Sequence, residues 1–550
     1  MTNLSLSLNR FALGPFLKRN ILFGLGVLAV LGVGVMFFNT HWGPGIGGDS
    51  TIYLTSAKDL ISGRGLGLIN ADGNFRLIPY FPPFFPLILA FFGLLNLDMV
   101  TAAQWMNNLL FGGIIWLSGF VIYRSLNSAV YAFLASFLVF ASPALIPVFS
   151  WVMSEPLSMF LGFLSLALLI QYFVQPNKLI ILILSSALVG LSLLTRYTSV
   201  SYLGTGLIGI ILFLDKSIRD RLKDCLTYLF VGIIPMIIWV AIDLNQTATV
   251  SSRSLESGTG MVNRIMSLFP SFRQSLLFWL VPDSWVYSPK YPVEINQFLP
   301  VAALILFLIW FGIVFGKYVK IKKGDRGNHF RLWVLLGIFC VIYFSVIVLV
   351  NILTYPPITI NSRMISPVYV AVLWLTIILA YNTEKNWARH RWLKVLMPVG
   401  ISLVIVWYGW ASFNITRQNY KQGLGFLSLE WQLSPTIQAI KALPTETILI
   451  TNQEMAVLFL TGRVSYPFRE AYQTIPSETF SSYGDGDLEN DKPQYLFREK
   501  GAALVLFDTL YDDLAGLYGE RTRERVTHLI EGLIISFKGN DGAIYFYPSP

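Results

Sequence analysis

About eleven stretches of roughly 20 apolar residues recur along the chain, and they constrain the fold more than any other feature. An α-helix needs about that length to cross the hydrocarbon core of a bilayer. The stretches lie at 21–40, 105–123, 128–149, 156–174, 179–195, 199–214, 225–242, 298–316, 332–353, 364–381 and 394–412. Charged residues make up only 13% of the chain, against about 25% in soluble domains. The sequence therefore predicts a polytopic α-helical membrane protein with about eleven transmembrane helices.

The basic residues indicate how these helices are oriented. Lys and Arg are concentrated in short segments such as 216–223 and 317–331, and such segments face the cytoplasm. Arg10, Lys18 and Arg19 precede the first stretch, which predicts an uncleaved signal anchor with a cytoplasmic N-terminus. We expect a multi-pass protein of the cell membrane (the inner membrane in a cell that has two). This topology accounts for the net charge of +9, and we expect no nucleic-acid partner.

The long segments between and after the helices fall on the opposite, outer face. They are the loops 41–104 and 243–297 and the C-terminal segment 413–550. In the last segment, short apolar runs alternate with helical patterns and end in a hairpin with its turn at GNDG, which predicts a small extracytoplasmic α/β domain. We expect 1–412 to be the transmembrane domain and the C-terminal domain to serve for packing or for docking an acceptor.

Two acids stand at the predicted outer boundary of the membrane. Asp49 follows the glycine-rich segment GPGIGG directly after the first stretch, and Glu155 lies in WVMSEPLSMF where another stretch begins. An acid at a membrane boundary can serve as a general base or as a metal ligand. Each also stands where a helix begins, so capping of that helix is the alternative interpretation.

Two arginines are predicted at the same depth as these acids. Arg196 lies in LLTRYTSV and Arg363 in NSRMISPVYV. A guanidinium stays charged and forms paired hydrogen bonds with phosphate oxygens, so the pattern predicts a phosphate-binding site. Anchoring of the side chains at the membrane interface is the alternative. Arg64, in the first outer loop, is a weaker candidate.

Metal-binding motifs built on histidine or cysteine are not found in the sequence. The four histidines form no HxxxH pattern, and the two cysteines are not arranged as a metal site. If a divalent cation binds, an oxygen ligand such as Asp49 favours magnesium, manganese or calcium.

The order of these segments resembles the GT-C class of membrane glycosyltransferases, which includes the protein mannosyltransferases and the lipid A aminoarabinose transferases. GGDSTIYLTSAKDLISGRGL followed by IPYFPPFFPLILAFFGLLN is similar to the first outer loop of that class, in which an acid is followed by Tyr, here Tyr53, and later by Pro-Pro before an interfacial helix. WVMSEPLSMF, LLTRYTSV and NSRMISPVYV resemble its later segments. The resemblance covers about 1–412.

This resemblance implies a transferase that moves a sugar from a polyprenyl-phosphate carrier to an acceptor hydroxyl on the outer face, with inversion at the sugar carbon. Asp49 would be the catalytic acid residue, acting as base or through a metal, and Glu155 would assist it. Arg363, Arg196, Arg64 and Tyr53 would bind the lipid phosphate. The acceptor would be a lipid, a glycan or a protein.

Two positions depart from the pattern of the class. Ser50 follows Asp49 where many relatives carry a second acid, and Phe81 precedes Pro82 where some lipid-directed relatives carry Lys. These departures leave the acceptor class and the metal dependence open. A polysaccharide polymerase or ligase and a transporter are the alternative functions; a transporter would place its charged residues near the middle of the membrane.

Overall fold

The computed structural model describes most of the chain, and the predicted signal anchor's Arg10 and parts of the loop 243–297 lie outside the described residues. The described residues are 15–77, 81–247, 254–255, 261–281, 293–319, 328–355, 360–387, 391–468 and 492–548.

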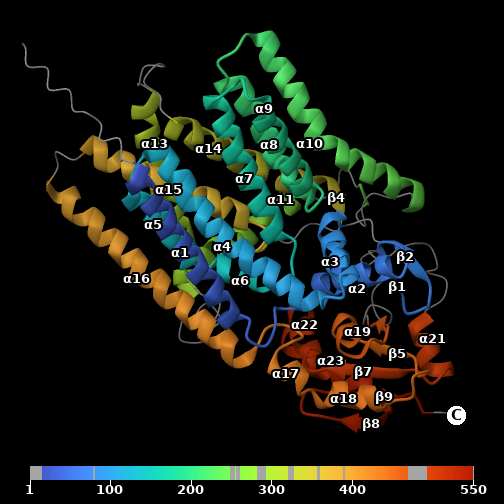
Figure 1. The fold of residues 1–550 in the computed structure, drawn as a ribbon. Coiled ribbons are helices and arrows are strands. Elements are labelled where there is room, and N and C mark those ends of the chain that lie inside the picture. Colours follow the sequence, from blue (N-terminus) through green and yellow to red (C-terminus); the bar gives the residue numbers. More distant parts are fainter. Residues whose placement is uncertain are drawn as a thin grey trace, which may run out of the picture.

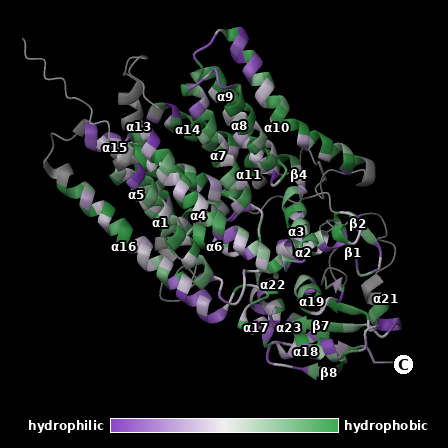
Figure 2. Ribbon diagram, in the orientation of Figure 1, coloured by the Kyte–Doolittle hydropathy of each residue, from purple (hydrophilic) through white to green (hydrophobic). Residues whose placement is uncertain are grey.

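Helices dominate the first 422 residues, and every predicted apolar stretch falls on one or more of them. The main bundle consists of α1 (Pro15–Asn39), α4 (Met99–Leu126), α5 (Ala129–Phe140), α6 (Leu145–Ser150), α7 (Glu155–Val174), α8 (Leu179–Leu193), α9 (Val200–Phe213), α10 (Ile218–Thr247), α13 (Val293–Val319), α14 (Asn328–Leu353), α15 (Ser366–Trp387) and α16 (Arg391–Gln422). Among the described residues, seven helices are long and apolar enough to cross a membrane. Figure 2 shows the apolar residues along this bundle. The predicted class, a polytopic α-helical membrane protein, is confirmed.

Several boundaries differ from the predicted ones. The stretch 128–149 is divided into α5 and α6, and a 3-10 turn, η1 (Tyr197–Ser199), precedes α9. The last helix, α16, continues ten residues beyond the predicted boundary at 412, because polar residues at its end are compatible with a helix outside the bilayer. The loop 243–297 contains a helix that was not predicted, α11 (Met261–Leu280).

The first predicted outer loop folds into two helices and a hairpin. These are α2 (Gly48–Ile61), the antiparallel pair β1 (Gly67–Ile69) and β2 (Phe75–Leu77), and α3 (Phe84–Leu94). The short helix predicted after Pro83 is therefore present. Figure 1 shows α2 and α3 between the helical bundle and the C-terminal domain, so both large parts of the molecule can support residues of this loop.

The C-terminal domain contains a five-stranded sheet with the order β6-β5-β7-β9-β8. Its strands are β5 (Leu449–Thr451), β6 (Tyr466–Pro467), β7 (Ala503–Phe507), β8 (Ile534–Lys538) and β9 (Gly542–Phe546). The first three are parallel, and β8 and β9 form an antiparallel hairpin. The helices are α17 (Leu429–Gln432), α18 (Pro435–Ala442), α19 (Glu454–Thr461), α21 (Lys492–Glu499), α22 (Thr509–Tyr518) and α23 (Thr522–Ile530). The segment thus has the α/β composition predicted for it.

Small residues allow close packing inside the bundle. A Cβ atom at Gly162 of α7 would lie 2.3 Å from the ring of Tyr202 on α9. That ring is buried and stacks on Phe339 of α14 with ring centroids 4.6 Å apart. Helices in membranes associate through such contacts because apolar burial gives little preference for one neighbour over the lipid.

We predict that Gly162→Ala destabilises the bundle, since the buried ring of Tyr202, stacked on Phe339, would have to shift to admit the added methyl group. Overpacking of this kind costs about 1–3 kcal/mol. Thermal unfolding of the detergent-purified protein measures the effect. Gly337→Ala, in α14, is the matched control, because a Cβ atom there would meet nothing within 4 Å. Equal melting temperatures for the two variants would contradict this account of the packing.

Candidate active site

The glycine-rich segment before Asp49 is packed between two other segments of the chain. Gly45 donates its N–H to the carbonyl of Ser150 at 2.8 Å and accepts at 2.9 Å from the N–H of Val152. A Cβ atom at Gly45 would lie 2.5 Å from the indole of Trp151. Position 45 must therefore be glycine, because only a residue without a side chain lets the backbone lie this close to the Trp151 indole.

The next residue connects the segment to the C-terminal domain. The carbonyl of Ile46 accepts a hydrogen bond of 2.9 Å from the N–H of Phe426. Gly425 has a φ of +54°, and a Cβ atom there would lie 2.1 Å from the Ile46 carbonyl oxygen. Asp49, three residues further on, is thus positioned by Trp151 on one side and by residues 425–426 on the other.

Both acids lie at the start of a helix, but neither caps it. Gly47 is the N-cap of α2, so Asp49 lies within the first turn, and its carboxylate binds Arg363. Glu155 is the first residue of α7, whose N-cap is Ser154. The capping interpretation is therefore wrong for both side chains, although the positive end of each helix dipole favours a carboxylate at this place.

Arg363 joins the two acids. It lies in the turn before α15, and its Nη2 is 2.9 Å from Oδ2 of Asp49 while its Nε is 3.0 Å from Oε1 of Glu155. Its third nitrogen, Nη1, lies 2.9 Å from the sulfur of Met153. One guanidinium thus links residues that are 314 and 208 positions before it in the sequence.

Arg196 approaches Glu155 from another direction. Its Nη1 lies 2.9 Å from the same oxygen, Oε1, and donates to Oγ of Ser154 at 3.1 Å. The side chain of Glu155 is 2% exposed, and its second oxygen, Oε2, has no hydrogen-bond partner among the described residues. We refer to Asp49, Glu155, Arg196 and Arg363 as the charged cluster; its formal charges cancel.

Electrostatics keep the two arginines charged. Burial by itself would lower the pKa of Arg196 and of Arg363, but the nearby carboxylates outweigh this effect, with Glu155 the larger contributor for both, and each pKa is raised. For Tyr53 the largest effect is burial, which raises its pKa well above the usual range although Arg196 opposes the shift. Tyr53 is therefore a neutral phenol, hydrogen-bonded to Ser154 at 3.1 Å.

Five of the six predicted site residues therefore gather in one place, and Arg64 does not. Arg64 follows the far end of α2, about 20 Å from Asp49 by the rise of a 14-residue helix. It donates through Nε and Nη2 to Oδ1 of Asp59, with the shorter bond at 2.6 Å. In the structure, the partner of Arg64 is therefore the buried carboxylate of Asp59, and a phosphate-binding role for Arg64 stays a prediction.

Sequence reasoning missed three residues that support the cluster. Ser154 lies between Tyr53 and Arg196, Met153 contacts Arg363, and the hydroxyl of Tyr343 donates to the carbonyl of Met364 next to Arg363. The position of Ser154 beside Glu155 in the sequence was a usable signal. Tyr343 lies in the middle of an apolar stretch, where nothing in the local pattern indicates its partner.

The donor set of the cluster does not build a cation site by itself. Within the described part of the chain, no group of three or more His, Cys, Asp or Glu side chains is arranged to hold a metal ion. The guanidinium of Arg363 lies between the two carboxylates, where a bridging cation would have to be. In the described chain the two carboxylates are therefore bridged by a guanidinium.

Comparison with solved structures identifies the fold. The chain is similar to ArnT from Cupriavidus metallidurans bound to undecaprenyl phosphate, with 13% identity and a TM-score of 0.54 over 94% of this chain and 97% of that one. It is also similar to the oligosaccharyltransferase AglB from Archaeoglobus fulgidus in complex with an inhibitory peptide and a dolichol-phosphate, with 10% identity and a TM-score of 0.51 over 97% of this chain and 75% of that one.

These likenesses show the fold alone: the chain shares the fold of ArnT and of AglB, and the resemblance to the GT-C class predicted a fold of this kind. The apo form of the Archaeoglobus enzyme gives a TM-score of 0.52 at 9% identity. No protein-family description matches the sequence, and no curated protein does. The resemblance noted from four short segments thus agrees with a likeness that extends over nearly the whole chain.

We predict that Arg196→Met destabilises the protein because it leaves Glu155 buried with one cation instead of two. Breaking a buried ion pair costs about 3–5 kcal/mol, and we expect the lower end because Arg363 remains. The double variant Glu155→Gln with Arg196→Met should lose less than the sum of the single variants in a double-mutant cycle of unfolding free energies. Strict additivity would show that the two side chains do not interact.

Proposed function

We propose that the protein is a glycosyltransferase that moves a sugar from a polyprenyl-phosphate carrier to an acceptor hydroxyl. The observation that carries this proposal is the bridge of Arg363 between Asp49 and Glu155, with Arg196 as a second cation. Such a cluster provides a base and two phosphate ligands within one site. Two proteins with the same fold are described with undecaprenyl phosphate and dolichol-phosphate, which supports a donor of this type.

Asp49 is the proposed base. Its side chain is 34% exposed, so an acceptor can reach it, whereas Glu155 is enclosed. In the reaction the acceptor oxygen attacks the anomeric carbon of the sugar while its proton passes to the carboxylate of Asp49. The bond between that carbon and the phosphate oxygen breaks, and its electron pair leaves with the phosphate. A single displacement of this kind inverts the configuration at the sugar carbon.

Arg363 and Arg196 are the proposed ligands of the lipid phosphate. Negative charge grows on the phosphate as it leaves, and fixed cations stabilise this charge. In the protein as described, Arg363 binds Asp49; a phosphate that takes over this guanidinium would release the carboxylate to act as a base. Glu155 is then a positioning residue, because its buried carboxylate holds both guanidiniums beside the place of reaction.

The location of the cluster supports this function over the alternative of a transporter. All four charged residues lie where helices begin or just outside them, at one end of the bundle. A polyprenyl chain stays in the bilayer, so its phosphate can reach a site only at this kind of boundary. We propose that this boundary is the outer one and that the N-terminus is cytoplasmic, as the distribution of Lys and Arg indicates. The acceptor is a lipid, a glycan or a protein on that side.

We predict that Asp49→Asn abolishes most transfer while the protein still folds, since an amide cannot accept the proton. Loss of a general base lowers rates by about 10²–10⁴-fold. Transfer from a polyprenyl-phosphate sugar, with the product detected by mass spectrometry, measures the effect. Asp72→Asn, which changes an acid in the same loop on the turn before β2, is the matched control and should retain activity. Full activity of a correctly folded Asp49→Asn variant would remove the proposed base.

We predict that Arg363→Ala weakens the binding of undecaprenyl phosphate by tenfold or more, because a charged hydrogen bond of about 1.5–3 kcal/mol is lost. Binding is measured by the change in protein fluorescence during titration with the lipid. Arg64→Ala is the control, since Arg64 lies outside the charged cluster. If both variants bind the lipid as the unaltered protein does, the phosphate role of Arg363 is wrong.

A further inference from the structure

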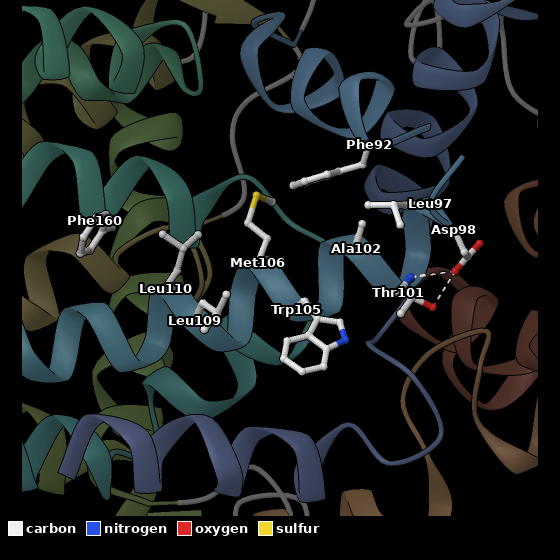
Figure 3. A pocket seen from close by; sticks show the side chains of 10 residues that line it. All are labelled: Phe92, Leu97, Asp98, Thr101, Ala102, Trp105, Met106, Leu109, Leu110 and Phe160. Carbon is white, nitrogen blue, oxygen red and sulfur yellow. Dashed lines mark hydrogen bonds between the residues drawn. The ribbon is translucent and has the colours of Figure 1, made fainter. Parts of the chain in front are cut away.

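A cavity of about 600 Å³ lies between α3, α4 and α7, and no residue of the charged cluster lines it. Its walls are almost entirely apolar; the main side chains are Phe92, Leu97, Trp105, Met106, Leu110 and Phe160. Figure 3 shows Trp105 and Leu109 on α4, with Phe92 across from them on α3 and Phe160 on α7. Cavities of about 300–1,000 Å³ accommodate ligands of the size of a small organic molecule or a lipid chain.

The cavity lies at the boundary of the predicted bilayer. The indole of Trp105 is 52% exposed and contacts the ring of Phe37, with ring centroids 4.4 Å apart. Phe37 is two residues before the end of α1, whose apolar span ends at Asn39. Tryptophan is enriched at membrane interfaces. The exposed apolar residues around the cavity, including Phe91 and Leu94, therefore face lipid, and a hydrocarbon chain can enter from the bilayer.

The cavity is separate from the charged cluster. A buried apolar layer contains Phe85 and Leu89 of α3 and Leu157 of α7. Met106 and Leu110, which line the cavity, pack against this layer. Phe85 in this layer also packs against the ring of Tyr53, with centroids 5.0 Å apart. A chain in the cavity would thus contact the helix that supports Tyr53 without entering the place of reaction.

A single charge lines the cavity and bears on which lipid would fit it. Asp98 is the only charged residue among those that line it. Its Oδ2 accepts hydrogen bonds of 2.8 Å from both N–H and Oγ1 of Thr101, as Figure 3 shows. No arginine or lysine is present among the lining residues to hold a phosphate monoester. A carboxylate repels such a group and attracts an ammonium group.

From these observations we infer that the cavity binds one hydrocarbon chain of a zwitterionic bilayer phospholipid with a primary ammonium headgroup, such as phosphatidylethanolamine. The chain lies against Trp105 and Phe160, and the ammonium group lies beside Asp98. The bound lipid supports α3 and, through Phe85, the ring of Tyr53. This site is independent of the proposed transfer reaction, because no residue of the charged cluster contributes to it.

The test uses the full-length protein, freed of lipid in detergent and then supplied with phosphatidylethanolamine, phosphatidylglycerol or undecaprenyl phosphate. Native mass spectrometry counts bound lipids, and thermal unfolding reports stabilisation. We expect phosphatidylethanolamine to bind at least tenfold more tightly than phosphatidylglycerol. Ala102→Leu, which fills the cavity, should remove this binding, whereas the matched Ala302→Leu on an exposed face of α13 should not.

Asp98→Asn separates the headgroup from the chain, since asparagine keeps the capping role at the start of α4. This variant should still bind phospholipid but should lose the preference for phosphatidylethanolamine over phosphatidylglycerol. Equal lipid binding by the unaltered protein and Ala102→Leu would overturn the site. A different outcome is that undecaprenyl phosphate binds more tightly than phosphatidylethanolamine and loses this binding in Ala102→Leu. That result would overturn the assignment of the occupant and show that the cavity binds the carrier lipid.

Discussion

The shared guanidinium of Arg363 is the interaction on which the rest of the site depends. Two carboxylates close together repel each other, and one of them, Glu155, is almost fully buried. A single planar cation between them removes this cost, and Arg196 supplies a second positive charge to the buried partner. The positive ends of α2 and α7 add to the stabilisation because each carboxylate lies in the first turn of its helix.

The same arrangement would allow the proposed phosphate to bind without rebuilding the core of the site. Glu155 stays in place as the buried counter-charge, while the pair formed by Arg363 and Asp49 is about one third exposed on each side. An incoming phosphate can therefore compete with Asp49 for the guanidinium at the surface. In the proposed reaction, binding of the donor and release of the base would then be two results of one exchange of partners.

The C-terminal domain takes part in this arrangement through the backbone. Residues 425–426 pair with Ile46, and Met455 of α19 packs beside α2 close to Gly48. Figure 1 shows this domain below α2 at the end of the bundle. The segment before Asp49 is mostly glycine, and its one large side chain, Ile46, is buried among residues that include Phe426 and Met455. The C-terminal domain is therefore a structural support of the acid.

The sequence by itself determined the helical bundle, the α/β composition of the last segment and the identity of the four charged residues. These follow from local signals: apolar length, alternating patterns, and a charge at the end of a stretch. It did not determine that Arg64 pairs with Asp59 or that α16 continues to Gln422, because partner choice and helix ends depend on distant neighbours. Only the tertiary structure decided that one guanidinium binds both acids, since the three residues come from parts of the chain that no local pattern connects.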